Sequence, residues 1–292
     1  MTTPSAPVHL VERAARRLHE AASLAGAPPP ELLTAVAPAP SAVPFEPPAL
    51  PEPLAPAPPA LDLTALEHAG MIAAGKKHRD RISEEFRLVQ GQLLRNMPPE
   101  GSAPGANVVM LTSARPGEGK SFTAINLAAS IAGYGKRPVL LVDADAARNA
   151  LTDRLGLADA PGLLDLAVNP ARGAHEMVVR TSLPNLSVLP IGGGREGRGE
   201  ISANLPVAGI IEQLARRFAN CIVVLDAPPC LSSSDPSVLA QIVGQIVMVV
   251  EAEQTQRTEV ESALELVQAC PVVALLLNKA RLTGTDTFGA YS

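Results

Sequence analysis

Residues 113–122 read SARPGEGKSF, a glycine-rich turn that runs directly into Lys120 and Ser121. The apolar segment NVVMLT precedes this turn, and the helix-forming segment TAINLAASIAG follows it. A strand, a loop and a helix in this order place backbone N–H groups and a helix N-terminus around a bound phosphate. The strict pattern G-x-x-x-x-G-K-[ST] fails at its first position, which is Ala114. The context nevertheless favours a phosphate-binding loop over an ordinary glycine-rich turn.

Short apolar segments alternate with helical segments from residue 107 onward. We expect strands at 107–112, 138–143, 185–190, 221–225, 245–250 and 272–277. Helical patterns lie between them, for example at 121–133, 203–217 and 258–269. Nearly continuous apolar strands that alternate with helices are typical of a parallel sheet covered on both faces. The expected fold class is therefore α/β, with a mainly parallel sheet flanked by helices.

Two of the predicted strands end in carboxylates. VLLVDADAAR (139–148) carries Asp143 and Asp145, and CIVVLDAPP (221–229) carries Asp226. Open α/β sheets bind ligands at the carboxyl edge of their strands, so these groups should meet the glycine-rich loop. One aspartate of the first pair can hold Mg²⁺ and the other can accept a proton, while Asp226 suits the water shell of the metal. Taken alone, the first pair could also be an acidic loop at a strand end.

The three strand ends together predict a site for a nucleoside triphosphate with Mg²⁺. Lys120 can reach the β and γ phosphates, and the Ser121 hydroxyl can ligate the metal. The residues expected to contact the nucleotide are Gly117, Glu118, Gly119, Lys120, Ser121, Phe122 and Asn278. The Asn278 amide could read an adenine edge, although asparagine at a strand end is also common in turns.

The bulk composition restricts the class of protein. A formal net charge of −5 gives no electrostatic reason to expect nucleic-acid binding. The three cysteines fit neither a disulfide framework nor a zinc site, which suits a reducing cytoplasm. The N-terminus lacks the apolar core of a signal peptide, and the longest apolar runs are too short to span a bilayer. We therefore expect a soluble protein that meets a membrane only through a partner.

Thirteen of the 29 prolines fall between residues 28 and 59, and such a stretch favours an extended linker. We expect four regions: an amphipathic helix in 1–26, a disordered Pro/Ala-rich linker at 27–60, a P-loop domain at 61–280, and a flexible tail at 281–292. Within the domain, 81–96 follows helical spacing, with Ser83 as a plausible N-cap.

Together, SARPGEGKSF, VLLVDADAAR and IVVLDAPP resemble the bacterial tyrosine kinases (BY-kinases) of polysaccharide-export systems. That family carries an A-x-x-x-x-G-K-[ST] loop, an aspartate-rich second motif and a D-x-P-P third motif, on a P-loop NTPase fold related to the ParA/MinD ATPases. The N-terminal HLVERAARRL, the Pro-rich linker, LDLTALEHAGMI and the closing FGAY resemble the exosortase-associated exopolysaccharide tyrosine autokinases.

The resemblance implies an ATP-dependent tyrosine autokinase that controls exopolysaccharide polymerisation or export. It makes Lys120 and Ser121 the phosphate and Mg²⁺ ligands, and Asp143 the metal-associated activator of a tyrosine hydroxyl. Asp145 would support Asp143, and Asp226 would complete the metal shell. The implied partner is a membrane-embedded chain-length (co-polymerase) protein, which would hold the kinase at the cytoplasmic face of the inner membrane.

Two features depart from the family pattern. Members usually end in a tyrosine cluster, whereas this chain has only Tyr134 and Tyr291, of which Tyr291 is the candidate phosphoacceptor. In the family's subunit-contact motif E-x-x-R-x-x-R, Glu84 and Arg87 match, but Gln90 stands where the second arginine belongs. A homo-oligomer is therefore possible, with one charge-assisted contact fewer.

Two other functions are also compatible with the sequence. One is a ParA/MinD-like switch that hydrolyses ATP and recruits partners without modifying them. The scarcity of tyrosine favours it, and Arg115 matches that group's signature lysine only partly. The C-terminus also lacks the basic amphipathic helix that would bring such a switch to a membrane. The other is a weakly catalytic kinase relative that serves as a regulatory binding subunit.

Overall fold

The computed structural model describes residues 61–72, 81–99, 102–147, 151–169, 172–194 and 207–280. The predicted N-terminal helix, the Pro-rich linker and the C-terminal tail with Tyr291 lie outside these residues. None of the helices in the described ranges has the length and apolar character needed to cross a bilayer.

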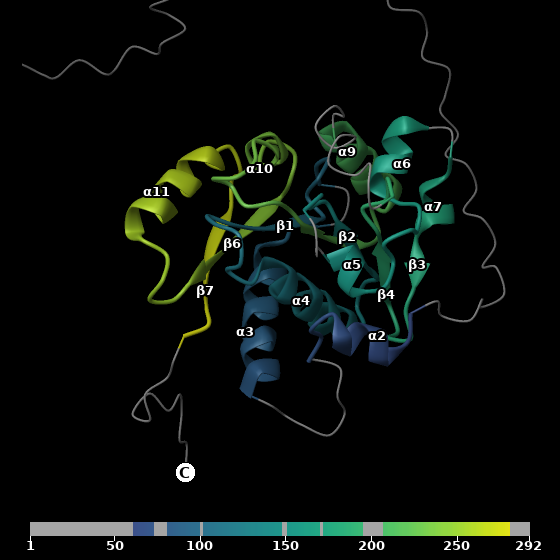
Figure 1. Ribbon diagram of the computed structural model, residues 1–292, viewed down its shortest axis with the longest axis horizontal. Coiled ribbons are helices and arrows are strands. Elements are labelled where there is room, and N and C mark those ends of the chain that lie inside the picture. Colours follow the sequence, from purple (N-terminus) through teal and green to yellow (C-terminus); the bar gives the residue numbers. More distant parts are fainter. Residues whose placement is uncertain are drawn as a thin grey trace, which may run out of the picture. The chain divides into compact units, whose positions relative to one another are not determined.

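A seven-stranded sheet lies at the centre of the described part of the chain (Figure 1). Its strands are β1 (Val108–Ser113), β2 (Val139–Asp143), β3 (Val179–Arg180), β4 (Leu186–Leu189), β5 (Ile222–Asp226), β6 (Gln245–Glu251) and β7 (Val273–Asn278). Their order is β3-β4-β2-β5-β1-β6-β7, and only the pairing of β3 with β4 is antiparallel. The six predicted strands all form, each end within one residue of the prediction. The two-residue β3 was not predicted, because it is too short to show a pattern.

Helices cover both faces of the sheet (Figure 1). One face packs against α2 (Leu63–His68), α3 (Arg81–Asn96), α4 (Lys120–Tyr134) and α5 (Leu151–Arg154). The other packs against α6 (Leu163–Val168), α7 (Ala174–Met177), α9 (Val207–Arg217), α10 (Asp235–Leu239) and α11 (Arg257–Leu266). Consecutive residues of β1 enter opposite layers: Val108 and Met110 face one, and Val109 and Leu111 face the other. This double burial explains the continuous apolar strands and confirms the predicted fold class.

Helix α3 lies against α4 through one stripe of side chains. Phe86, Gln90 and Leu93 are buried, at the spacing of one helical face. The Phe86 ring lies 6.1 Å from the Phe122 ring of α4. The helix is already formed at Arg81, whose side chain pairs with Glu85 at 2.9 Å. The prediction of Ser83 as N-cap is therefore wrong, because Ser83 lies inside the first turn.

Candidate nucleotide site

The sheet register brings the predicted carboxylates together. Asp226 at the end of β5 is in register with Asp143 of β2 on one side and with Leu111 of β1 on the other. Strand β1 then continues into the glycine-rich loop two residues later. The three strand ends predicted to form the site are therefore neighbours at the carboxyl edge of one parallel sheet.

The loop between β1 and α4 depends on two glycines. Gly117 and Gly119 have φ angles of +88° and +101°, in the left-handed region that disfavours residues with a Cβ. At Gly119 a Cβ would also lie 2.1 Å from the Asn278 Nδ2 atom. Gly119 is the N-cap of α4, and no side chain accepts a hydrogen bond there from the first turn. The helix N-terminus thus keeps backbone donors for an anion.

Lys120 at the start of α4 is buried and paired. Its Nζ atom lies 3.0 Å from Asp145 Oδ2, and both side chains are 8% exposed. The other oxygen of Asp145 accepts a hydrogen bond from the Ala147 N–H at 3.1 Å. The predicted phosphate-binding lysine and the second aspartate of the DAD segment therefore meet directly.

Asp143 is held by three hydrogen bonds. Its Oδ2 accepts from the Thr152 N–H at 2.7 Å and from the Thr152 hydroxyl at 2.6 Å. Its Oδ1 accepts from the Asp145 N–H at 3.1 Å. Complete burial raises the pKa of Asp143 to about 6, although the bonds from Thr152 oppose this rise. Oδ1, with its single longer bond, keeps the larger capacity to accept a further proton or ligand.

Asp226 differs from the other two aspartates because it lacks partners. It is fully buried, and neither carboxylate oxygen makes a hydrogen bond of normal geometry with the described residues, although the Ser121 hydroxyl lies near enough to lower its pKa. Burial raises the pKa of Asp226 to about 7, against the charge of nearby Lys120. Mg²⁺ commonly binds one or two carboxylates together with phosphate oxygens and water. A buried, unpartnered carboxylate beside Ser121 and Lys120 fits a site for this ion and its water shell.

The glycine-rich loop is held by hydrogen bonds that could not be predicted from the sequence. The Glu118 side chain is buried, and its carboxylate accepts hydrogen bonds from the Arg115 N–H at 2.6 Å, the Glu251 N–H at 3.3 Å and the Thr255 hydroxyl. The Asn278 amide donates to the Glu118 carbonyl at 2.8 Å. Of these two residues, the Glu118 N–H and the Asn278 Oδ1 atom can still contact a nucleotide. No local pattern near Glu118 signals contacts with residues so distant in the chain.

Phe122 also has a structural role. Its ring is the one that contacts Phe86 of α3, as described above. Phe122 therefore joins the two helices on this face of the sheet.

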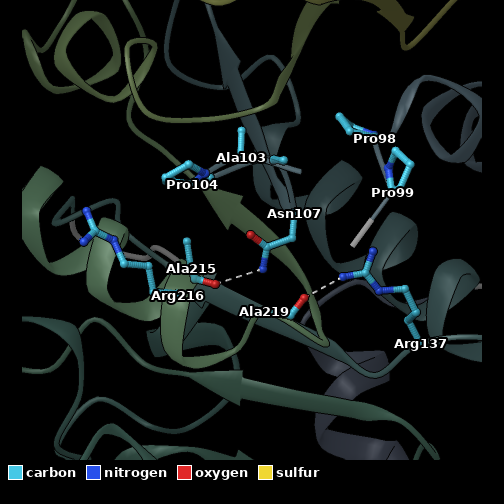
Figure 2. Close-up of a pocket in the computed structure, with 11 residues that line it drawn as sticks. Pro98, Pro99, Ala103, Pro104, Asn107, Arg137, Ala215, Arg216 and Ala219 are labelled. Atoms are coloured by element: carbon cyan, nitrogen blue, oxygen red, sulfur yellow. Dashed lines mark hydrogen bonds between the residues drawn. The ribbon is translucent and has the colours of Figure 1, made fainter. Parts of the chain in front are cut away.

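A cavity of about 270 Å³ lies at the opposite, amino-terminal end of the strands (Figure 2). Prolines 98, 99 and 104 line it together with Asn107 and Arg137, and none of the predicted site residues does so. The Asn107 amide donates to the Ala215 carbonyl at 3.3 Å, and Arg137 Nη2 donates to the Ala219 carbonyl at 2.9 Å (Figure 2). These polar groups satisfy carbonyls at and just beyond the end of α9.

Known proteins share both the sequence and the fold. The chain is 35% identical over 206 residues to "Putative tyrosine-protein kinase EpsB" of Ralstonia nicotianae, which covers 70% of this chain and 26% of EpsB. It is 28% identical over 185 residues to tyrosine-protein kinase YwqD of Bacillus subtilis, covering 63% and 76% of the two chains. The chain is a homologue of the bacterial tyrosine kinases. No protein-family model matches the sequence.

Another relative of this chain is named as a transport protein. It is the succinoglycan biosynthesis transport protein ExoP of Rhizobium meliloti, 32% identical over 192 residues, which covers 64% of this chain and 24% of ExoP. The chain thus spans about a quarter of the length of EpsB and of ExoP.

Solved structures confirm the fold of this kinase homologue. The kinase domain of Escherichia coli ETK has a TM-score of 0.60 at 20% identity, covering 73% of this chain and 81% of that one. The kinase domain of VpsO has a TM-score of 0.53 at 26% identity, covering 69% and 100%. The cell-division ATPase MinD of Pyrococcus furiosus has a TM-score of 0.50 at 21% identity, covering 58% and 70%. The predicted P-loop fold of ParA/MinD-like type is confirmed.

Proposed function

We propose that this chain is an ATP-dependent protein-tyrosine autokinase that regulates exopolysaccharide synthesis or export. The observation that carries the proposal is the ion pair of Lys120 with buried Asp145 beside two further buried aspartates, one of them without a hydrogen bond of normal geometry, at the edge where a nucleotide binds in this fold. The tyrosine-kinase names of the relatives favour phosphoryl transfer to protein over a switch that only hydrolyses ATP.

The loop and the start of α4 would hold the phosphates. Backbone N–H groups of Gly117 to Ser121 and the helix N-terminus form the cradle, and Lys120 exchanges Asp145 for a phosphate oxygen. The Ser121 hydroxyl and Asp226 would hold Mg²⁺, which when bound neutralises charge on the β and γ phosphates. Asn278 Oδ1 remains the candidate for an adenine contact.

Asp143 is the candidate group for receiving the tyrosine proton. A free tyrosine hydroxyl has a pKa of about 10, and a carboxylate acts as general base best when its own pKa is near the working pH. Burial raises the pKa of Asp143 to about 6, which improves the match. Oδ1 would accept the proton as the hydroxyl oxygen attacks the γ-phosphorus and the bond from that phosphorus to the bridging oxygen of the leaving ADP breaks, while Thr152 keeps Oδ2 in place.

The position of Tyr134 argues against it as an acceptor within its own subunit. Lys120 begins the 15-residue helix α4 and Tyr134 ends it, so roughly 20 Å separates Tyr134 from the phosphate cradle. The exposed Tyr134 ring lies 5.0 Å from the Lys136 ammonium, at the far end of the helix. Tyr134 therefore cannot approach a γ-phosphate of its own subunit in this fold.

The proposed partners are a membrane-embedded chain-length protein and further copies of this chain. The transport name of ExoP supports the first, which would place the kinase at the inner membrane. For the second, Glu84 and Arg87 lie on the exposed side of α3, where they pair with each other at 2.9 Å. Both side chains are more than half exposed, and so they are accessible to a neighbouring subunit.

One experiment tests the kinase proposal. Purified protein is incubated with γ-labelled ATP and Mg²⁺, with and without the cytoplasmic part of the membrane partner, and the wild type is compared with Lys120→Met, Tyr291→Phe and Tyr134→Phe. We expect label on the wild type and on Tyr134→Phe, and none on the other two variants. Release of phosphate without labelled protein, unchanged by Tyr291→Phe, would instead establish the ATPase switch.

A further inference from the structure

The last strand of the sheet holds two consecutive carbonyl groups of the phosphate-binding loop. Lys279 Nζ donates to the Gly117 carbonyl at 2.8 Å, and Asn278 Nδ2 donates to the Glu118 carbonyl at 2.8 Å. These donors lie about 160 residues further along the chain, at and just after the end of β7. Two neighbouring peptide units of the loop are thus held by a segment that belongs to neither β1 nor α4.

Holding a carbonyl also orients an N–H group. The described peptide bonds are trans, and in a planar trans peptide the C=O of one residue and the N–H of the next point in opposite directions. The Gly117 carbonyl faces Lys279, so the Glu118 N–H faces away from β7. The Glu118 carbonyl faces Asn278, so the Gly119 N–H also faces away from β7.

The strand order shows which groups lie on the side of the loop away from β7. Strand β7 lies on one side of β1, beyond β6, whereas β5 and β2 lie on the other side. Asp226 and Asp143 end those two strands, and Asp145 follows β2 to meet Lys120. N–H groups that face away from β7 therefore face the side of the loop on which the aspartates and Lys120 gather.

Lys279 has an unusual backbone conformation and a second side-chain contact. Its φ angle is +58°, a left-handed conformation that is uncommon for a residue other than glycine and marks local strain. Its ammonium also pairs with Glu251 Oε2 at 3.0 Å, and Glu251 ends β6. The ion pair with Glu251 thus gives the Lys279 ammonium a second contact beside its hydrogen bond to Gly117.

We propose that Lys279 is a positioning residue for the phosphate-binding loop: by holding the Gly117 carbonyl it orients the Glu118 N–H toward the phosphates. Asn278 does the same for the Gly119 N–H through the Glu118 carbonyl. The inference rests on the nucleotide binding contained in the proposed function, but not on tyrosine as the acceptor. Lys279 acts through the loop and does not contact the reacting atoms.

The test compares Lys279→Met with Lys279→Arg and with Lys136→Met, which removes an exposed lysine at the far end of α4. The dissociation constant for ATP is measured by calorimetry, and unfolding by urea is measured without nucleotide. We expect Lys279→Met to weaken ATP binding about 10-fold, the equivalent of one charge-assisted hydrogen bond, and Lys279→Arg to recover most of the loss. The urea midpoint of both variants should match the wild type, because Lys279 is half exposed.

Steady-state phosphorylation adds a readout that a purely structural role would not give. Lys279→Met should raise KM for ATP about 10-fold and leave kcat at saturating ATP within about 2-fold. The inference is overturned if Lys279→Met binds ATP as the wild type does, if Lys136→Met weakens binding equally, or if the loss follows a lowered urea midpoint. A wild type that binds ATP without labelling tyrosine would overturn the proposed function alone, and one that does not bind ATP would overturn both.

Discussion

Lys120 and Asp145 form an ion pair that is almost closed to solvent, with 3.0 Å between Nζ and Oδ2 and 8% exposure of each side chain. The lysine proposed to bind phosphate is thus already neutralised by a carboxylate that follows a nearby strand. Breaking a buried pair is costly when one charge is left alone, whereas exchange of one anion for another is not. Under the proposed function, Asp145 would keep Lys120 in the site until a phosphate takes its place.

Replacement of Asp145 by Asn should make the protein depend more on nucleotide for its stability. The amide still accepts a hydrogen bond from Lys120 but loses the charge, so we expect the nucleotide-free protein to lose about 1–3 kcal/mol. ADP should restore part of this loss, because its phosphates supply the missing anion. The measurement is the rise in Tm on addition of ADP in Mg²⁺-free buffer. A rise no larger than that of the wild type would contradict the exchange.

The raised pKa of Asp226 predicts an unusual dependence of stability on pH. Burial raises this pKa from 3.8 to about 7, so between these values the folded protein binds more protons than the unfolded chain. The free energy of unfolding contributed by Asp226 should therefore be greatest below pH 4 and fall as the pH rises toward 7. Asp143, with a pKa raised to about 6, acts in the same direction up to that pH.

Asp226→Asn tests this effect in Mg²⁺-free buffer. Because the amide does not ionise, the free energy of unfolding of the variant should fall less steeply with rising pH. The variant should therefore gain stability relative to the wild type between pH 5 and pH 7. Urea unfolding at pH 5, 6 and 7 measures the difference, with Glu84→Gln as the control for an exposed carboxylate. Parallel stability curves for the wild type and Asp226→Asn would show that Asp226 is ionised throughout this range.

Thr152 should matter for the stability of the protein and for the placement of Asp143, the proposed general base. Its hydroxyl donates to Asp143 Oδ2 and accepts from the Ile191 N–H at 2.9 Å, so Thr152→Val leaves a buried N–H without a partner. We expect a loss of about 1–3 kcal/mol in the free energy of unfolding, while Thr152→Ser should stay close to the wild type. Urea unfolding of the two variants provides the comparison. A loss in Thr152→Ser that exceeds the loss in Thr152→Val would show that the methyl group, and not the hydroxyl, is what the site requires.

Gln90 is expected to stabilise the domain rather than a subunit contact. It is 6% exposed, and its Oε1 accepts a hydrogen bond from the Ser130 hydroxyl of α4 at 2.6 Å. Gln90→Ala should lower the free energy of unfolding by about 1–3 kcal/mol, whereas Gln92→Ala, on the exposed side of the same helix, should change it by less than about 0.5 kcal/mol. Analytical ultracentrifugation should show the same oligomeric state for both variants. A change in oligomer size with Gln90→Ala alone would contradict this assignment.

The strands and the edge that carries the site could be predicted because their signals are local. Each central strand is buried on both faces, so its residues are apolar without interruption, and each aspartate stands where such a run stops. Parallel strands place all their carboxyl ends at one edge of the sheet. For this reason Lys120, Asp143 and Asp226 could be assigned to one site from the sequence. The N-cap at Ser83 failed because residues near a helix start can satisfy the pattern from inside the first turn.

The sequence alone thus determined the α/β class, the strands, the loop and the set of charged groups at one edge. The tertiary structure decided what each group contacts: that Lys120 pairs with Asp145, that Thr152 occupies Asp143, and that Asp226 has no partner. It also decided that Lys279 reaches Gly117, since strand order, and not position in the chain, brings β7 next to β6 and the loop. Periodicity and turn chemistry act over a few residues, whereas these contacts join residues that only the packed sheet makes neighbours.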